Sequence, residues 1–368
     1  MIWLVNMKQI KSEYFTEAEI LTSIENNKIL LADLETNLTC NGRCKYCFRG
    51  IPLLNKKHIV VPFDLLLNRI DTLKKAGVRT INLIGGGEPL IYYYKGKTCI
   101  DIIKFICKNN ITVEIFTNGL VLGNTASCKR LFGFTPEEVI KVFYESNVTI
   151  FLKCHSLKKD TYNSLIGKNV FEQFITALEL LEKSHYYGSN FPQLVIQCTI
   201  SKTNYSQIKG IWTYANKKHL ATSFELVRAS GCARINDQSL NSQEARILFE
   251  KIADLDKEEK IKKPLIPPYI GYTCDLNKFA CYVDVKGDLY NCESMALKFG
   301  NISQGDIQEQ IAQSKDMQMM RHIDKHIQGS CKKCNYLLDG TCWGGCRGNA
   351  HIAGNVFGSD PLCWHISP

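Results

Sequence analysis

The segment ILLADLETNLTCNGRCKYC (residues 29–47) joins an apolar strand pattern directly to three closely spaced cysteines. Its first ten residues predict a β-strand. Cys40, Cys44 and Cys47 follow in the pattern C-x3-C-x2-C, on the loop after that strand. Three thiolates at this spacing can hold a cubane [4Fe–4S] cluster and leave one iron without a protein ligand. The alternative is a structural zinc site, but structural zinc prefers four protein ligands in a closed geometry.

Short strand patterns alternate with longer helical patterns from this segment to residue 227. The expected strands are 29–38, 79–84, 111–116, 148–153, 193–200 and 223–227. The expected helices are 61–76, 98–109, 136–146, 171–184 and 205–219. Alternation of this kind predicts an α/β protein with parallel βα units. Because six strands are too few to close an eight-stranded barrel, we expect a partial (β/α)6 TIM barrel with its chemistry at the C-terminal ends of the strands.

The composition narrows the class of protein further. The chain has 368 residues, 45% of them hydrophobic, which is enough to bury a core. Its net charge is +9 without a basic run, so we expect a solvated surface and no nucleic-acid partner. No apolar stretch approaches a membrane span and no signal-peptide pattern is evident, so a cytoplasmic protein is expected. Seventeen cysteines in such a chain indicate metal or iron–sulfur ligation rather than disulfides.

The cysteine motif resembles that of the radical S-adenosylmethionine (SAM) superfamily, including an aromatic residue, Tyr46, before the third cysteine. Two further motifs of that family follow in order, GGGEP (residues 85–89) after the second strand and TNG (residues 117–119) after the third. The resemblance implies that the open iron binds SAM. Reductive cleavage of SAM would then give a 5′-deoxyadenosyl radical that abstracts a hydrogen atom from the substrate.

The resemblance also implies which residues contact SAM. GGGEP would bind its amino group, TNG its methionine and ribose portions, and the sixth strand its adenine side. The SAM-binding candidates are Tyr46, Gly85, Gly86, Gly87, Glu88, Pro89, Thr117, Asn118, Lys153 and Val227. The fourth strand departs from the family, because KCHS (residues 153–156) stands where relatives carry Ser-x-Asp-Gly. Lys153 would therefore replace a ribose-contacting hydroxyl.

The C-terminal part of the chain resembles the SPASM domain, which carries two auxiliary [4Fe–4S] clusters. It follows a Pro-rich linker, KKPLIPPY (residues 262–269), and holds eight cysteines. The resemblance implies one cluster on Cys274, Cys281, Cys292 and Cys346, and another on Cys331, Cys334, Cys342 and Cys363. Cys334 and Cys342 are separated by seven residues where the family has five. A pair of zinc ribbons is the alternative.

These patterns divide the chain into four parts. We expect an N-terminal helical extension over residues 1–28, too short for a separate peptide-binding domain, and the radical SAM partial barrel over 29–235. A helical bridge with the linker would cover 236–270, and the SPASM domain 271–368. The family resemblance extends over nearly the whole length from residue 34 to residue 363.

Three residues are candidates for catalysis beyond SAM cleavage. Glu293 follows Cys292, where sulfatase-maturating enzymes place a catalytic Asp, and could accept a proton. Cys154 and Cys232 are expected at strand ends, where a thiol could return a hydrogen atom to a substrate radical. His155 and Arg228 share these strand ends and could touch substrate. For all of them an ordinary structural role is the alternative, and the remaining cysteines are expected to be buried apolar residues.

The resemblance implies an enzyme but leaves the substrate open. Oxidative modification of a peptide or protein, by crosslinking, side-chain oxidation or epimerisation, is the first hypothesis. An epimerase or dehydrogenase of a small molecule such as an amino sugar or cyclitol is the second, and an electron carrier that does not cleave SAM is the third. Sulfatase maturation is disfavoured, because Gly85 replaces a Gln and Glu293 replaces an Asp. A reducing partner such as flavodoxin or ferredoxin is expected.

Overall fold

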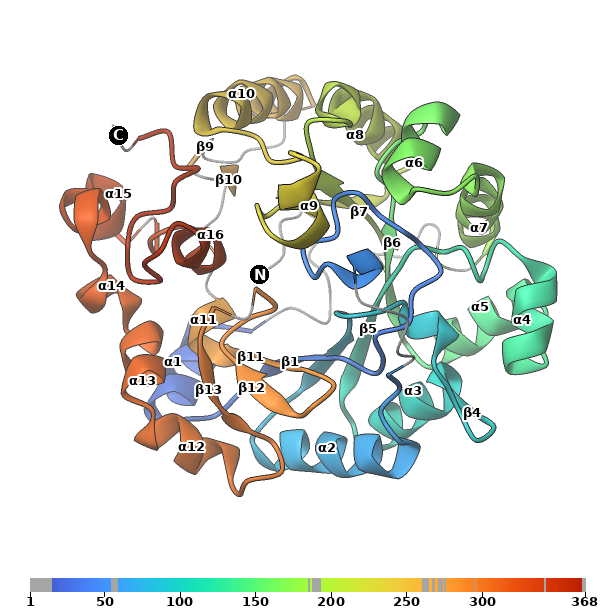
Figure 1. Cartoon of the computed structure of the whole chain (residues 1–368), viewed down its shortest axis with the longest axis horizontal. Helices are drawn as coiled ribbons and strands as arrows, with labels where there is room; N and C mark the ends of the chain where they lie inside the picture. Colours follow the sequence, from blue (N-terminus) through green and yellow to red (C-terminus); the bar gives the residue numbers. More distant parts are fainter. Residues whose placement is uncertain are drawn as a thin grey trace.

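A curved sheet ringed by helices forms the centre of the molecule (Figure 1). The computed structural model describes residues 15–53, 59–184, 186, 193–259, 265–266, 269–270, 274, 276–294, 296–340 and 342–365. Six strands form the barrel, namely β1 (Leu31–Leu34), β2 (Thr80–Leu83), β5 (Thr112–Thr117), β6 (Thr149–Lys153), β7 (Leu194–Ile200) and β8 (Ala221–Leu226). They pair in this order and all in parallel, which confirms the partial α/β barrel.

Amphipathic helices cover the outer face of these strands. The expected helices are present as α2 (Phe63–Lys75), α3 (Cys99–Lys108), α5 (Pro136–Glu145), α7 (Phe171–Lys183), α8 (Ile208–Lys217) and α10 (Ser242–Glu258). In α3, for example, Ile102, Ile103 and Ile106 are fully buried, and a capping box between Thr98 and Asp101 starts the helix. The main core therefore lies between the sheet and the helix ring.

The sequence patterns leave several short elements unpredicted within the barrel. They are α4 (Thr125–Phe132), α6 (Lys159–Ile166), α9 (Gly231–Ile235), the hairpin of β3 (Tyr93–Tyr94) and β4 (Lys97–Thr98), and the 3₁₀ helices η2 (Ile51–Leu53), η3 (Pro89–Ile91) and η4 (Tyr205–Gln207). These elements are too short for a hydrophobic period to develop. Most of the expected linker lies outside the described residues, apart from β9 (Leu265–Ile266) and β10 (Tyr269–Ile270), which pair antiparallel.

The C-terminal segment continues the barrel sheet. Its strands β11 (Ala280–Val283), β12 (Asp288–Tyr290) and β13 (Lys298–Asn301) extend the sheet beyond β1, and β11 runs parallel to β1. The remaining elements are α1 (Glu17–Glu25), α11 (Leu276–Phe279), α12 (Ile307–Gln313), α13 (Lys315–Arg321), α14 (Ile323–His326), η5 (Gly329–Lys333), α15 (Asn335–Leu338) and α16 (Arg347–Ile352). The tail and the barrel therefore share one sheet, and the tail covers the strand edge that an open barrel would otherwise expose.

The helices also bear on the expectation about membranes. Across the described ranges, we find no helix with both the length and the apolar character needed to span a bilayer.

Candidate active site

The first three cysteines lie on the loop that follows β1. A Cβ built on Gly42 would lie 3.3 Å from the Cys44 sulfur and 3.8 Å from the Cys40 sulfur, so both sulfurs approach this glycine. Burial raises the pKa of Cys40 to about 12 and that of Cys44 to about 11. A neighbouring cysteine raises each pKa further, Cys44 that of Cys40 and Cys47 that of Cys44. Thiols in such a setting ionise when a metal centre compensates their charge. The loop therefore fits an iron–sulfur cluster.

The glycine run of GGGEP packs against the segment that leads into Cys40. A Cβ on Gly86 would lie 2.1 Å from the Leu38 side chain, and a Cβ on Gly87 would lie 2.1 Å from the Thr39 carbonyl oxygen. Only glycine permits this approach. The Glu88 amide donates a hydrogen bond to the same Thr39 carbonyl at 2.8 Å, which fixes the glycine run beside the cysteine loop.

Glu88 connects this glycine run to TNG. Its buried carboxylate accepts hydrogen bonds from the Thr117 hydroxyl at 2.6 Å and from the Asn118 amide at 2.9 Å. Burial raises the pKa of Glu88, and these bonds offset part of that effect. The Asn118 side chain donates in turn to Asn41 at 2.7 Å, within the cysteine loop. The three sequence motifs therefore form one hydrogen-bonded unit.

These motifs meet around a cavity of about 840 Å³, which we call the motif cavity. Of the sequence-assigned residues, its lining includes Cys40, Cys44, Tyr46, Cys47, Gly85, Gly86, Gly87, Glu88, Asn118 and Lys153. Pro89, Thr117 and Val227 are not among the described residues that line it. Thr117 acts on the cavity through Glu88, whereas Val227 is buried in the main core. The donor set and the size suit a bound SAM molecule.

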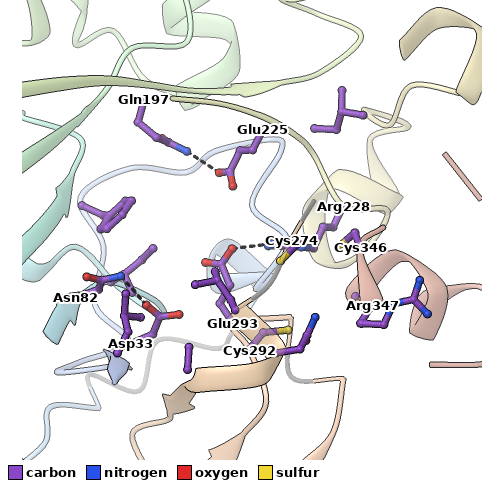
Figure 2. Close-up of a pocket in the computed structure, with 18 residues that line it drawn as sticks. Asp33, Asn82, Gln197, Glu225, Arg228, Cys274, Cys292, Glu293, Cys346 and Arg347 are labelled. Atoms are coloured by element: carbon purple, nitrogen blue, oxygen red, sulfur yellow. Dashed lines mark hydrogen bonds and ion pairs between the residues drawn. The ribbon is translucent and has the colours of Figure 1, made fainter. Parts of the chain in front are cut away.

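A second cavity of about 1,020 Å³ lies between the barrel strands and the C-terminal segment, and we call it the inner cavity (Figure 2). Three of the tail cysteines, Cys274, Cys292 and Cys346, line it. Both cavities are lined by Ile84, Phe116, Gln197, Glu225 and Glu293. The cysteine loop and the tail cysteines therefore face one continuous interior.

Glu293 lies where the two cavities meet. Its carboxylate forms an ion pair with Arg228 at 2.7 Å (Figure 2). The Arg228 guanidinium also lies over the Phe48 ring, 4.9 Å from its centroid, and Phe48 directly follows Cys47. Burial lowers the pKa of Arg228, but Glu293, Cys346 and Glu225 outweigh burial and hold it well above its usual value. Arg228 thus positions Glu293 between the two groups of cysteines.

Glu225 is a partly buried carboxylate that the strand pattern does not reveal as functional. It accepts hydrogen bonds from the Gln197 side chain at 2.5 Å and from the Thr199 hydroxyl at 3.1 Å. Burial and the nearby Glu293 raise its pKa. The available signal in the sequence is a charged residue inside a strand, ATSFEL, whose other residues are all buried, which indicates a polar barrel interior.

The two candidate hydrogen donors do not reach either cavity. Cys154 directly follows β6 as expected, but it is fully buried, and burial raises its pKa to about 12. Cys232 lies in α9 instead of at a strand end, and its amide donates to the Cys47 carbonyl at 2.8 Å. Neither is among the described residues lining the cavities. Their role as hydrogen donors stays a prediction without support from this geometry.

His155 packs beside the cysteine loop. Its ring lies 4.5 Å from the Tyr46 ring, and its Nδ1 accepts a hydrogen bond from the Thr199 amide at 3.2 Å. Burial, with a smaller contribution from Lys153, lowers its pKa to about 3. His155 is therefore a neutral residue that orders the loop, and it is not among the described residues lining either cavity.

The outer tail cysteines also group together. The Cys334 amide donates to the Cys331 carbonyl at 3.0 Å. Burial raises the pKa of Cys363 to about 12, with contributions from Asp360, Cys331 and Cys342. This group fits the expected second auxiliary cluster, whereas Cys281 lies apart from the other three cysteines of the first.

A parallel partial barrel whose first strand leads into a three-cysteine loop, with a cysteine-rich tail on its edge, defines a radical SAM enzyme with an auxiliary-cluster domain. Residues 34–192 match the model of the radical SAM superfamily, and residues 274–335 match that of the SPASM iron–sulfur cluster-binding domain. The chain therefore carries a radical SAM domain followed by a SPASM domain.

Solved structures share this fold at low sequence identity. Streptococcus suis SuiB bound to SAM is 17% identical, with a TM-score of 0.65 over 94% of this chain and 80% of SuiB. SuiB bound to the precursor peptide SuiA gives 16% identity and a TM-score of 0.65, over 94% of this chain and 79% of that one. The protein anSMEcpe with bound AdoMet is 17% identical, with a TM-score of 0.66 over 90% of this chain and 90% of anSMEcpe.

A curated sequence relative matches over a shorter region. "Putative protein YfkA" of Bacillus subtilis (strain 168) is 30% identical over 87 residues. This match covers 23% of this chain and only 22% of YfkA.

Proposed function

We propose that the chain uses SAM and three [4Fe–4S] clusters to modify a peptide or protein by a net two-electron oxidation. The observation that carries this proposal is the shared lining of the two cavities. A substrate in this interior touches the SAM side and the tail cysteines at once, and Glu293 lies between them. Loss of a hydrogen atom, a proton and an electron from one substrate would then occur within a single site.

The clusters would be held at the cysteines that the sequence predicts. Bound there, they and SAM would supply the hydrogen-abstracting 5′-deoxyadenosyl radical and the route for the second electron. Glu88 orders the TNG loop that holds SAM. Glu293 accepts the substrate proton, and Arg228 fixes its position. A flavodoxin or ferredoxin would supply the reducing electron.

The polar floor of the inner cavity supports a peptide substrate. Asn82 Oδ1 and Gln197 Oε1 are buried and accept no hydrogen bond within the described residues. Both residues line the inner cavity. Buried acceptors of this kind are satisfied by donors on a bound ligand, and the amide N–H groups of a peptide are such donors. SuiB and anSMEcpe, which share the fold, have been solved with peptides bound, SuiA and the Kp18Cys peptide.

Hydrogen abstraction can test the substrate class without knowing the substrate. The reconstituted protein would be incubated with SAM, dithionite and material from cells grown in deuterated medium. That material would be divided into a peptide digest and a peptide-free small-molecule fraction. Deuterium in 5′-deoxyadenosine with the peptide digest supports the proposal. Transfer from the small-molecule fraction alone contradicts it and favours the epimerase or dehydrogenase hypothesis.

Solvent deuterium separates oxidation from epimerisation. In a reaction run in deuterated water on unlabelled peptides, oxidation adds no solvent deuterium at the reacting carbon. Epimerisation through an exchangeable thiol adds one. An oxidised product two hydrogens lighter supports the proposal, and a product of unchanged oxidation state that carries solvent deuterium contradicts it.

A further inference from the structure

Two pairs of polar side chains, each an amide beside a carboxylate, line separate parts of the inner cavity. Asn82 of β2 lies with Asp33 of β1, and Gln197 of β7 lies with Glu225 of β8 (Figure 2). The residues before and after each of the four along its strand belong to the main core. Because successive side chains of a strand point to opposite faces, all four side chains point into the barrel.

A hydrogen bond within each pair fixes the orientation of the amide. The Asn82 Nδ2 donates to Asp33 at 3.0 Å, and the Gln197 Nε2 donates to Glu225 at 2.5 Å. An ionised carboxylate only accepts hydrogen bonds, so each amide turns its nitrogen to the carboxylate and its oxygen elsewhere. These oxygens, Asn82 Oδ1 and Gln197 Oε1, accept no hydrogen bond within the described residues, although Asn82 is only 2% exposed and Gln197 only 3%. Each pair therefore offers acceptor atoms to the cavity, and a ligand that fits there must bring donors.

The charges of the inner cavity also favour a cation. Glu225 accepts hydrogen bonds from neutral side chains and forms no ion pair within the described residues. Of the two guanidinium groups in the described lining, that of Arg228 is paired with Glu293, and that of Arg347 donates to backbone carbonyl oxygens of the tail. Burial and Glu293 raise the pKa of Glu225, and Arg228 and Lys153 offset this only in part. A cation beside Glu225 would balance its charge, whereas the neutral N–H of a peptide bond would not.

We propose that the substrate peptide places a lysine or arginine side chain in the inner cavity, where the two amide–carboxylate pairs bind its cationic head. An ammonium group carries three N–H donors and a guanidinium group five, so either can donate to a carboxylate and to an amide oxygen at once. The apolar part of the lining, which includes Leu31 and Phe116, would contact the methylene groups of such a side chain. Asp33 and Asn82 are not among the described residues that line the motif cavity, so this pair is separate from the SAM side. The inference rests on the proposed function, since it takes the substrate to be a peptide.

Retention of peptides without turnover tests this binding. The reconstituted protein, with SAM and no reductant, would be dialysed against four pooled peptide libraries, each with its own mass tag. The libraries carry lysine, arginine, glutamine or glutamate at one central position and only uncharged residues elsewhere. We expect the lysine peptides, the arginine peptides or both to be retained at least about 10-fold more than the glutamine peptides, the value of one charge-assisted hydrogen bond. Equal retention of basic and glutamine peptides, or no retention of any peptide, would overturn the inference.

Variants of the two pairs show whether the carboxylates cause the preference. Glu225→Gln and Asp33→Asn each keep an oxygen acceptor but remove a charge, and each should lower the ratio of basic to glutamine peptides towards one. Glu250→Gln, at an exposed position paired with Arg246, should keep the wild-type ratio. Because the ratio is taken within one mixture, partial unfolding of a variant does not change it, and a wild-type ratio in both cavity variants would overturn the inference. Retention of basic peptides without deuterium transfer from any peptide to 5′-deoxyadenosine would instead contradict the proposed function, so the two failures are distinguishable.

Discussion

Glu88 illustrates how one side chain can serve two motifs. The resemblance assigns it to SAM, yet both of its carboxylate oxygens accept hydrogen bonds from TNG, at Thr117 and Asn118. Its direct contribution is to hold the third-strand loop against the cysteine loop. The same carboxylate joins two motifs that are about thirty residues apart in the sequence into one hydrogen-bonded unit.

Glu88→Gln is expected to weaken SAM binding while the iron content stays unchanged. The amide NH₂ of Gln would face either the Asn118 N–H or the Thr117 hydroxyl and lose a charge-assisted hydrogen bond, a cost of roughly 1.5–3 kcal/mol or about 10- to 150-fold in Kd. Isothermal titration of the reconstituted protein with SAM measures the change. Glu293→Gln, the same substitution where the cavities meet, should bind SAM normally, and equal losses in both variants would contradict the assignment.

Glu225 predicts a pH-dependent stability. Its pKa is raised above the ordinary 4.5, so the folded state holds this proton more tightly than the unfolded state. Its stabilising contribution is then present below pH 4.5 and is lost as the pH rises through the folded pKa. Glu225→Gln keeps an oxygen acceptor for Gln197 and Thr199 but carries no charge. We expect this variant to have a higher melting temperature than the wild type at pH 8, and we expect the difference in melting temperature to shrink towards pH 5.

Thermal melts of the metal-free chain at the two pH values check this expectation. Glu250→Gln, at an exposed position paired with Arg246, should show no pH-dependent difference. A Glu225→Gln variant that is less stable than wild type at both pH values by the same amount would contradict the sign of the effect.

Residues near the cysteine loop could be predicted from the sequence because their chemistry is carried by local motifs. Cys40, Glu88 and Asn118 line the motif cavity as the motifs require. Glu225 could not be predicted, because its role depends on Glu293, which lies far away in the sequence and is brought close only by the barrel. Cys281 is buried in the main core and is not among the described residues that line the inner cavity, and spacing alone says nothing about which face of a strand a thiol occupies.

At the scale of elements, the end of β1 ties the cysteine loop to the tail. Glu35 is fully buried, pairs with Arg49 at 2.7 Å and accepts a hydrogen bond from the Val285 amide at 3.0 Å. Its carboxylate also accepts a hydrogen bond from the Tyr282 hydroxyl. Because Arg49 lies two residues after Cys47, one carboxylate links the SAM-side loop, β1 and the β11–β12 hairpin.

Glu35→Gln is expected to lower the free energy of unfolding by about 3 kcal/mol, the lower end for breaking a buried ion pair, because Arg49 keeps some contact with solvent. Urea unfolding of the metal-free chain measures it. Glu172→Gln breaks the exposed Lys159–Glu172 pair and should cost less than about 1 kcal/mol. Similar losses in the free energy of unfolding for the two variants would show that the buried Glu35–Arg49 pair contributes little to stability.

The repeating elements were predictable and the joining elements were not. Strands and helices of the barrel match the periodicity within a few residues, as in α7, expected over 171–184 and observed over Phe171–Lys183. The pairing of β11 with β1 cannot be predicted from the sequence, because no local pattern identifies the partner of an edge strand across about 250 residues. The tail therefore looks like a separate metal-crosslinked unit in the sequence but completes the barrel sheet in the structure.

At the scale of the molecule, the shared sheet brings two groups of cysteines to the barrel interior, and a third group lies farther along the tail. The cysteine loop lines the motif cavity, three tail cysteines line the inner cavity, and Cys331, Cys334, Cys342 and Cys363 group farther along the tail. An ordered series of this kind suits electron transfer between the substrate and an external partner. This arrangement supports our proposal that one chain holds three clusters.

Iron and acid-labile sulfide per chain, after anaerobic reconstitution, test that claim most directly. The measurement would compare the wild type with the Cys40/Cys44/Cys47→Ala variant. We predict roughly 12 Fe in the wild type and roughly 8 in the variant, with equal sulfide. Roughly 4 Fe in the wild type and none in the variant would contradict the three-cluster arrangement and, with it, the oxidative reaction.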